Sequence, residues 1–341
     1  MSEHDLSAGG HDLSAGGGVM DRVRGCAQDA LAAYGAHPGA AVELLNVSEN
    51  ATFLVTEPGA APSVLRVHRL GYHTEAEIAS ELAWMDALRA EAGVRTPRVL
   101  PAADGRRVVT VPERAGPADR YCVRFEFLPG TEPGGSGDDL AHFAALGEIT
   151  ARMHRHAREW DRPAWFTRFH WDYPAAFGGQ ARWGRWQDGI GVGPAERAIL
   201  GRLDDVLRER LHAFGSGTER YGLVHADTRL ANLLVNDGSV SVIDFDDAGF
   251  SWYLYDLGTA VSFFEHEPRV PGLVDAWLRG YRQAGTLSAA DEAEIWTFIM
   301  FRRLLLVAWI GSHRAVDIAA ELGAGYTQGS CDLAETYLST H

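Results

Sequence analysis

The chain has 341 residues, 46% of them hydrophobic and 23% charged, which is typical of a globular protein large enough for two compact lobes. Its formal net charge is -15, and no basic stripe appears, so nucleic acid is not an expected partner. All 31 of its Lys and Arg residues are arginine, and the absence of lysine excludes a Walker-type phosphate loop and a Schiff-base enzyme.

Cysteine and histidine give no sign of a structural or catalytic zinc site. The three cysteines, Cys26, Cys122 and Cys331, are far apart, and the 14 histidines are scattered without paired spacing. We therefore expect incidental or buried thiols rather than a zinc enzyme.

The N-terminal segment is a tandem repeat. HDLSAGG occupies residues 4–10 and again residues 11–17. A Gly- and Ser-rich segment of low hydrophobicity does not bury enough apolar surface to offset the entropy of ordering, so residues 1–19 are predicted to form a disordered tail. No signal-peptide pattern is present, and we expect a cytoplasmic protein.

Residues 20–130 are predicted to form a nucleotide-binding lobe built on a small antiparallel sheet with one inserted helix. Gly93 marks the end of the inserted helix. In chain order, the expected elements are a helix over 21–34, strands over 42–45, 52–56 and 63–68, a helix over 75–92, and strands over 107–111 and 121–127.

Residues 131–341 are predicted to form a mainly helical catalytic and acceptor-binding lobe, after a loop over 130–137. Helices are expected around 143–153, over 195–213 and over 290–320. One β-like island lies between them: strands over 233–235 and 240–243, joined by a turn at Asn236-Asp237-Gly238. The most apolar stretch, 298–310, is interrupted by Arg302 and Arg303, so we expect a buried helix with a charged edge rather than a membrane span.

The stretch 221–264 carries the chemistry. His225-x-Asp227 follows an apolar run, Asn232 comes five residues later, and a hairpin leads to Asp244 in the sequence IDFDD. Phosphoryl transfer needs a carboxylate that orients and deprotonates the attacking hydroxyl, together with oxygen ligands for Mg²⁺. Asp227 suits the first role, and Asn232 and Asp244 suit the second. His225 is expected to support the loop by hydrogen bonding.

Aspartate and asparagine are also common in loops because they cap turns. A lone H-x-D would therefore mean little. The order and spacing of the whole pattern favour a phosphotransferase site over this alternative.

The same stretch resembles the aminoglycoside phosphotransferase and choline kinase-like family, which shares the protein-kinase-like fold. Within that family it resembles the homoserine kinase type II and stress-response kinase branch, over residues 38–320. The resemblance implies Asp227 as catalytic base and Asn232 and Asp244 as metal ligands, with Asp246 as a further metal or substrate contact. The chain departs from the family at Ala226, where Gly is frequent, and at 229–231, where the family often has His-Pro-Gly.

The resemblance also assigns parts of the first lobe to the nucleotide. Arg66 stands where the family usually has an ATP-contacting lysine, and an arginine can hold phosphate oxygens bidentately. Glu81 is its expected partner, with Glu77 one turn away as the alternative. The turn at Ser48-Glu49-Asn50 would cover the phosphates, although it lacks the glycines of protein kinases. The segment from Glu126 to Leu128 would be the hinge whose backbone bonds the adenine.

The sequence therefore predicts an α+β, two-lobed, protein-kinase-like fold with a β-rich first lobe and a helical second lobe. The expected activity is Mg²⁺-dependent transfer of the γ-phosphoryl group of ATP or GTP to a hydroxyl of a small molecule. A protein Ser/Thr acceptor and a non-catalytic nucleotide-binding module are the alternatives. The short segment after Asp244 disfavours the first alternative, and the intact acidic motif disfavours the second. The oligomeric state stays open.

Acidic residues of the second lobe suggest that the acceptor carries an amine. Carboxylates near a site attract cations and raise their local concentration. The alternative is that these carboxylates are solvated or serve the metal. The candidates are Asp172, Asp246, Asp247, Glu265 and Glu267.

Overall fold

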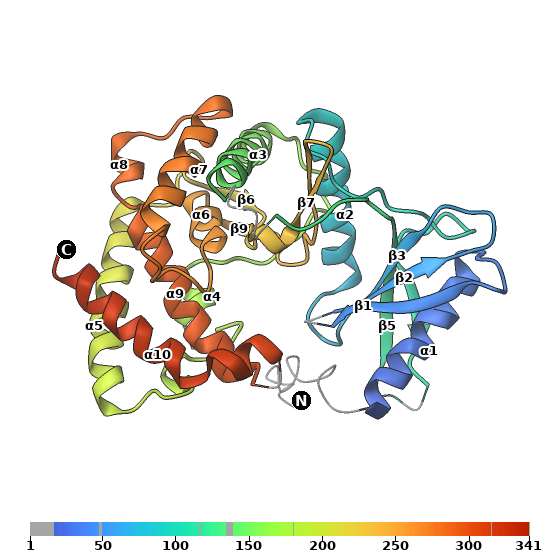
Figure 1. Ribbon diagram of the computed structural model, residues 1–341, viewed down its shortest axis with the longest axis horizontal. Coiled ribbons are helices and arrows are strands. Elements are labelled where there is room, and N and C mark those ends of the chain that lie inside the picture. The colour runs from blue at the N-terminus through green and yellow to red at the C-terminus, as the bar shows by residue number, and fades with distance from the viewer. Residues whose placement is uncertain are drawn as a thin grey trace. The chain divides into compact units, whose positions relative to one another are not determined.

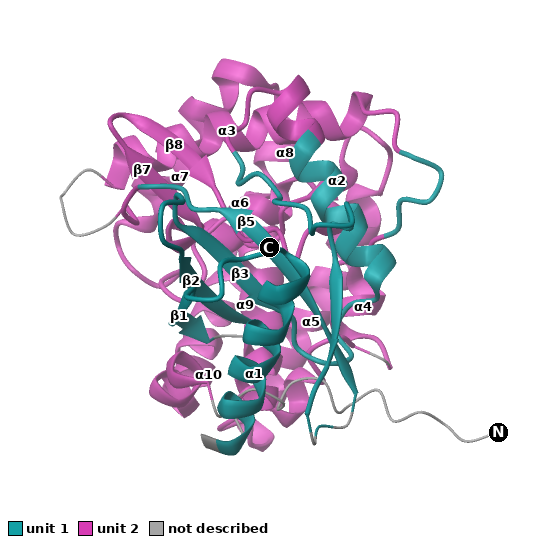
Figure 2. Ribbon diagram, turned by 90° about the vertical axis from the view of Figure 1, so that its right-hand side faces the viewer, with its two compact units in different colours: residues 1–86, 96–129, 163–167 teal, residues 87–95, 130–162, 168–341 magenta. Residues whose placement is uncertain are grey.

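The computed structural model describes residues 17–340 apart from 48–49, 115, 117, 134–138, 180 and 315. The chain divides into two compact units, coloured separately in Figure 2. The first comprises residues up to Asp86 together with 96–129 and 163–167. The second comprises residues 87–95, 130–162 and those from Arg168 onward.

The first unit is built on an antiparallel sheet of five strands in the order β1-β2-β3-β5-β4. Figure 1 labels β1, β2, β3 and β5 of this sheet. The insertion of a helix between β3 and β4 confirms the predicted topology. The strands are β1 (Ala41–Val47), β2 (Ala51–Thr56), β3 (Ser63–Val67), β4 (Val109–Pro112) and β5 (Asp119–Glu126).

One face of this sheet is covered by α1 (Gly17–Ala33). Because successive side chains of a strand point to opposite faces, Phe53 and Val55 of β2 share the face that packs on Val23 and Ala27 of the helix. The predicted boundary between tail and lobe at residue 20 falls inside this helix. The rest of the predicted tail, residues 1–16, lies outside the described residues.

Helix α2 (Glu75–Glu91) begins and ends where the sequence predicts. The Thr74 hydroxyl accepts from the backbone N–H of Glu77, whose carboxylate accepts in return from the Thr74 backbone N–H, a reciprocal N-terminal cap. Gly93 ends the helix with a φ of +63°, a conformation that costs glycine little.

The second unit is mainly helical, as predicted. Its first long helix, α3 (Asp139–Glu159), packs against α7 (Val270–Ala284). Glycines allow the two backbones to approach closely, because a Cβ atom at Gly280 would lie 1.8 Å from the carbonyl oxygen of Ala144. The other helices before the C-terminal region are α4 (Tyr173–Phe177), α5 (Pro194–Phe214) and α6 (Leu254–Ala260).

The predicted helix over 290–320 is wrong as a single element. The chain forms α8 (Ala289–Glu292), α9 (Ile295–Ser312) and α10 (Asp317–Leu338). By length and composition Ala289–Ser312 could cross a membrane, but 83% of its apolar window is buried inside the protein, as in a core helix. The predicted charged edge is also wrong, because Arg302 and Arg303 are both buried.

Two small sheets carry the polar motif. β6 (Tyr221–Val224) pairs with β9 (Gly249–Trp252), and β7 (Leu233–Asn236) pairs with β8 (Ser239–Val242). The β7–β8 hairpin turns at Asp237 and Gly238, which both have positive φ values, 47° and 75°. This is the two-residue turn that the sequence predicts, since such turns match the twist of the flanking strands. The β6–β9 pair was not predicted.

Candidate active site

The loop that follows β6, residues 225–232, holds the H-x-D motif. Ala226 adopts a φ of +66°, which turns the chain sharply after the buried strand. His225 bridges this turn: its Nε2 lies 3.1 Å from the carbonyl oxygen of Ile243, and its Nδ1 accepts from the backbone N–H of Asp227 at 3.3 Å. Both contacts suit a neutral imidazole protonated on Nε2. His225 thus supports the loop by hydrogen bonding, as predicted.

The carboxylate of Asp256 on α6 accepts hydrogen bonds from the backbone of the same loop. Its Oδ1 accepts from the N–H of Ala226 at 2.7 Å, and its Oδ2 accepts from the N–H of His225 at 3.2 Å. His154 of α3 lies 2.9 Å from Oδ2 and is itself 3.0 Å from the Tyr281 hydroxyl of α7. The close packing of α3 and α7 therefore fixes a buried chain of hydrogen bonds that ends at the 225–232 loop.

Asp227 is surrounded by hydrogen-bond donors. Arg229 donates to both of its oxygens, at 3.0–3.2 Å, and Arg302 of α9 donates to Oδ1 at 3.2 Å. Asn232 donates to Oδ2 at 2.8 Å. Burial by itself would raise the pKa of Asp227, but the guanidinium groups of Arg229 and Arg302 hold that pKa below its usual range. The carboxylate is therefore ionised at neutral pH.

Asn232 and Asp244 are brought together by the hairpin. The N–H of Ile243 donates to the carbonyl oxygen of Asn232 at 2.9 Å, so Asp244 is one residue from a direct backbone contact with Asn232. The Asn232 amide nitrogen donates to both the backbone and the side chain of Asp227, at 2.8 Å each. Because the amide nitrogen is committed to Asp227, the amide oxygen is the part of this side chain that could serve as a metal ligand.

This donor set fits a hard divalent cation. Carboxylate and amide oxygens are what Mg²⁺ and Ca²⁺ prefer, and Mg²⁺ commonly keeps waters and phosphate oxygens as its remaining ligands. Asp244 is exposed and has a φ of +60°, while Asp246 is buried two residues further on. Among the described residues no group of three His, Cys, Asp or Glu side chains gathers as a metal cluster.

The backbone after Asp244 is held from the 168–171 segment. Arg168 donates to the carbonyl oxygens of Asp246 and Ala248, and Trp171 Nε1 donates to that of Asp247 at 2.8 Å. These bonds fix the path of the acidic residues.

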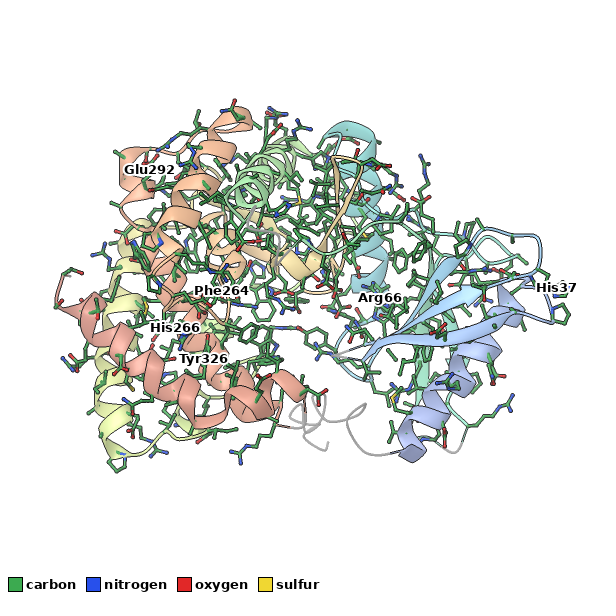
Figure 3. The ribbon with its side chains drawn as sticks, viewed as in Figure 1. His37, Arg66, Phe264, His266, Glu292 and Tyr326 are labelled. Atoms are coloured by element: carbon green, nitrogen blue, oxygen red, sulfur yellow. The ribbon has the colours of Figure 1, made fainter. Side chains whose placement is uncertain are left out.

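In the first unit, Arg66 and Glu81 form the predicted ion pair. Arg66 Nη2 lies 2.6 Å from Glu81 Oε1, and both side chains are buried. Arg66 extends from β3 (Figure 3), and its guanidinium lies over the Phe125 ring, 5.2 Å from the centroid. Glu77, the other candidate, caps α2 through Thr74.

The remaining predicted nucleotide contacts differ in how far the structure describes them. Ser48 lies outside the described residues. Asn50 is buried, and its Oδ1 accepts from the N–H of Arg69 at 3.0 Å. Glu126, at the end of β5, accepts from and donates to the backbone of Arg98. Leu128 is half-buried in the irregular segment that follows.

Three of the carboxylates that the sequence offered for an acceptor amine have protein partners. Glu265 is buried between Arg303 and the Tyr326 hydroxyl, and Asp172 caps α4. Glu267 pairs with Arg269 at the surface. Asp247 is half-buried, and burial together with the Asp247 charge raises the pKa of Tyr255, a neighbour of Arg302, to about 12.

Sequence reasoning missed Arg229 and Arg302 as partners of Asp227. Arg229 stood in a segment noted only for its departure from the family pattern. Arg302 lies in the most apolar stretch of the sequence. This position could have indicated a buried ion pair, because an arginine in such a helix is rarely buried without a carboxylate partner.

The model of the phosphotransferase enzyme family matches residues 41–293, most of the chain. The chain belongs to this family. The relationship confirms the resemblance at the level of the family and of the kinase-like fold.

Individual members of the phosphotransferase family are similar over nearly the whole chain. An uncharacterised protein of Deinococcus radiodurans is 30% identical over 286 residues, which is 82% of this chain and 80% of that protein. The structure of a microcompartment-associated aminopropanol kinase is 50% identical, covers 93% of this chain and 98% of its own, and has a TM-score of 0.86. An amicoumacin kinase in complex with AMP-PNP, Ca²⁺ and Ami is 24% identical, covers 92% and 95%, and has a TM-score of 0.75.

This phosphotransferase is an enzyme, a kinase that transfers a phosphoryl group to a hydroxyl of a small molecule. The predicted small-molecule activity is confirmed, and the alternative of a non-catalytic module is set aside. The individual site residues stay predictions.

Proposed function

We propose that the protein phosphorylates the hydroxyl group of a small amino alcohol, with ATP as donor and Mg²⁺ as the divalent cation. The observation that carries this proposal is the aminopropanol kinase that shares half of its residues with this chain over almost the full length of both. The geometry around Asp227 supports it, since an ionised carboxylate stands in the motif where the family activates a hydroxyl.

Asp227 orients the acceptor and takes its proton. As the hydroxyl oxygen forms a bond to the γ-phosphorus, its O–H proton passes to Asp227, and the bond from phosphorus to the bridging oxygen of ADP breaks. A carboxylate of low pKa is a weak base, so its main contribution is to align the hydroxyl for in-line attack. His225 and Asp256 contribute by holding the backbone on which Asp227 stands.

Asn232 and Asp244 would hold the cation, with Asp246 as a further oxygen donor. When bound, Mg²⁺ offsets the negative charge of the phosphate oxygens. In the first unit, the Arg66–Glu81 pair would present a guanidinium to phosphate oxygens in place of the usual lysine. Asn50 would support the phosphate-covering turn, and the backbone from Glu126 to Leu128 would bond the adenine.

Asp247 is the carboxylate that we assign to the acceptor's ammonium group. It is half-buried and follows the proposed metal ligands in the chain. Its charge acts on both Tyr255 and Arg302, and Arg302 is a direct partner of Asp227, which supports a role near the acceptor. Asp247→Asn should therefore raise the KM for an amino alcohol more than the KM for ATP.

A turnover screen tests the proposal directly. Purified protein is incubated with ATP or GTP, Mg²⁺ and one alcohol: 1-aminopropan-2-ol, ethanolamine or the uncharged propane-1,2-diol. The masses of the products are measured by mass spectrometry. We expect one added phosphoryl group on an amino alcohol, little on the diol, and none with Asp227→Asn. Wild-type protein that phosphorylates only uncharged or anionic alcohols would refute the amino-alcohol assignment.

A further inference from the structure

The carboxylate of Asp227 has no free acceptor position in this structure. Two carboxylate oxygens offer about four lone-pair sites. Oδ2 accepts from Asn232 at 2.8 Å and from Arg229 Nη2 at 3.1 Å, while Oδ1 accepts from Arg229 Nε at 3.0 Å and from Arg302 Nη2 at 3.2 Å. A substrate hydroxyl that donates to Asp227 must therefore replace one of these donors.

Arg302 is not the donor that leaves. Its side chain is almost fully buried, and each of its three nitrogens has a partner. Nε donates to the Ser262 hydroxyl at 3.1 Å, Nη1 donates to the Tyr255 hydroxyl at 2.9 Å, and Nη2 donates to Asp227. Moving this guanidinium would leave a buried charge without its carboxylate, which is strongly unfavourable.

Asn232 is equally fixed. It is buried, and its amide nitrogen also donates to the backbone oxygen of Asp227. Its backbone is held to Ile243 across the hairpin. Displacing the side chain would therefore break several contacts at once.

Arg229 is the donor that can move. A third of its side chain is exposed, and within the described part of the chain its hydrogen bonds all go to Asp227. Beyond these bonds its guanidinium lies over the Phe263 ring, 5.6 Å from the centroid. Phe263 has a φ of +78°, a strained conformation for a residue with a bulky side chain.

We propose that the two arginines divide the task of presenting Asp227: Arg302 is a positioning residue that holds Oδ1 permanently, and Arg229 occupies the place of the acceptor hydroxyl and yields it when the acceptor binds. This inference rests on the proposed role of Asp227 as the group that meets the hydroxyl. It assigns functions to two residues that the sequence pattern does not single out: Arg229 within the 225–232 loop, and Arg302, which is 75 positions from Asp227 in the chain.

The arrangement has a measurable consequence for acceptor affinity. If Arg229 covers Asp227 in the free enzyme, only the fraction of molecules in which it has moved binds the hydroxyl, and the apparent affinity falls by that fraction. Arg229→Gln should therefore bind a hydroxyl-bearing acceptor more tightly than wild type, by about threefold or more, the scale of a partly exposed ion pair. The kcat of this variant need not rise.

The test compares an acceptor with its analogue that lacks the hydroxyl. Calorimetry measures the Kd of 1-aminopropan-2-ol and of propylamine on wild type and Arg229→Gln, with AMP-PNP and Mg²⁺ saturating. Loss of a positive charge favours both amines alike, so the proposal requires a larger gain for the amino alcohol. Equal gains, or weaker binding of the amino alcohol, would overturn it.

Arg302 is tested against its neighbour on α9. Arg302→Lys keeps the positive charge but can make only one of the three hydrogen bonds of Arg302. It should lower kcat about 10- to 100-fold with a small change in acceptor KM, because displacement of the Asp227 carboxylate by about 1 Å can cost that much. Arg303→Lys is the matched control, because Arg303 is buried on the same helix but bonds Glu265 and Ser330 instead of Asp227. It should lower the melting temperature while keeping kcat within about threefold, the scale of a minor perturbation.

If the lysine variant folds poorly, kcat is measured on Arg302→Met instead, because an apolar side chain suits the protein core. A kcat of Arg302→Lys and Arg302→Met close to that of wild type would overturn the positioning role, as would an equal loss of kcat in Arg303→Lys. Should wild type phosphorylate no amino alcohol, the proposed substrate fails by itself. The Arg229 comparison then uses whichever alcohol the turnover screen identifies, with its deoxy analogue.

Discussion

Replacement of Glu265 by glutamine should destabilise the second unit and leave acceptor binding nearly unchanged. Glu265 and Arg303 are both buried, and Glu265 also accepts from the Tyr326 hydroxyl at 2.9 Å. The change keeps the shape of the side chain but leaves the guanidinium without a counter-charge. Loss of one partner of a buried pair costs about 3–5 kcal/mol.

That cost is large against a total stability of roughly 5–15 kcal/mol. For a unit of this size it corresponds to a fall in melting temperature of roughly 6–20 °C. Circular dichroism melts of wild type and Glu265→Gln measure this directly. The paired replacement Glu265→Leu with Arg303→Met should recover most of the loss, because an apolar pair needs no compensating charge.

Glu267→Gln is the matched control. It lies two residues away and pairs with Arg269, with both side chains partly exposed, so its loss should cost less than about 1 kcal/mol. A structural role and a binding role for Glu265 predict different results for this variant. A Glu265→Gln variant that melts within about 2 °C of wild type, the scale of a single weak contact, but has a much higher acceptor KM would show that the carboxylate serves the substrate instead of Arg303.

Two further predictions concern the metal and the pH dependence of stability. Asp244→Ala should remove the dependence of nucleotide affinity on Mg²⁺ and lower kcat roughly 10²-fold or more; calorimetry with and without Mg²⁺ checks this, and an unchanged metal dependence would reject Asp244 as a ligand. Burial lowers the pKa of His154, against the opposing effect of Asp256, so the folded state binds this proton less readily than the unfolded state. Its contribution to stability is therefore present above the unfolded pKa of about 6.5 and is lost as the pH falls through the folded pKa. Urea midpoints should fall more between pH 7 and pH 5 for wild type than for His154→Asn, and parallel curves would argue against a neutral buried His154.

The chemical motif could be predicted from sequence because it is local. Asp227, Asn232 and Asp244 lie within 18 residues, and the turn at Asp237-Gly238 dictates that the two strands between them fold back on each other. The Arg66–Glu81 pair was expected from the family resemblance, and the structure places Arg66 on β3 and Glu81 on α2, the next helix. For the acidic motif, backbone geometry over a few residues determines which side chains meet.

The helix boundaries in the C-terminal region could not be predicted from the spacing of apolar residues. The apolar residues from 290 to 320 predict one helix, yet Ser288 caps a short α8, and the chain breaks again before α9 and α10. The apolar pattern continues from α9 into α10 because both helices contribute buried residues, whereas α8 has none. Only the backbone conformation of the connecting residues separates them.

The sequence alone determined the family, the two kinds of lobe and the acidic motif, because these follow from local patterns of apolar, turn-forming and charged residues. Only the tertiary structure decided what surrounds Asp227 and which carboxylates are already engaged. Arg302 reaches Asp227 across 75 positions, and Glu265 meets Arg303 across 38. Such pairs form when helices pack, and no local periodicity encodes which buried arginine meets which carboxylate.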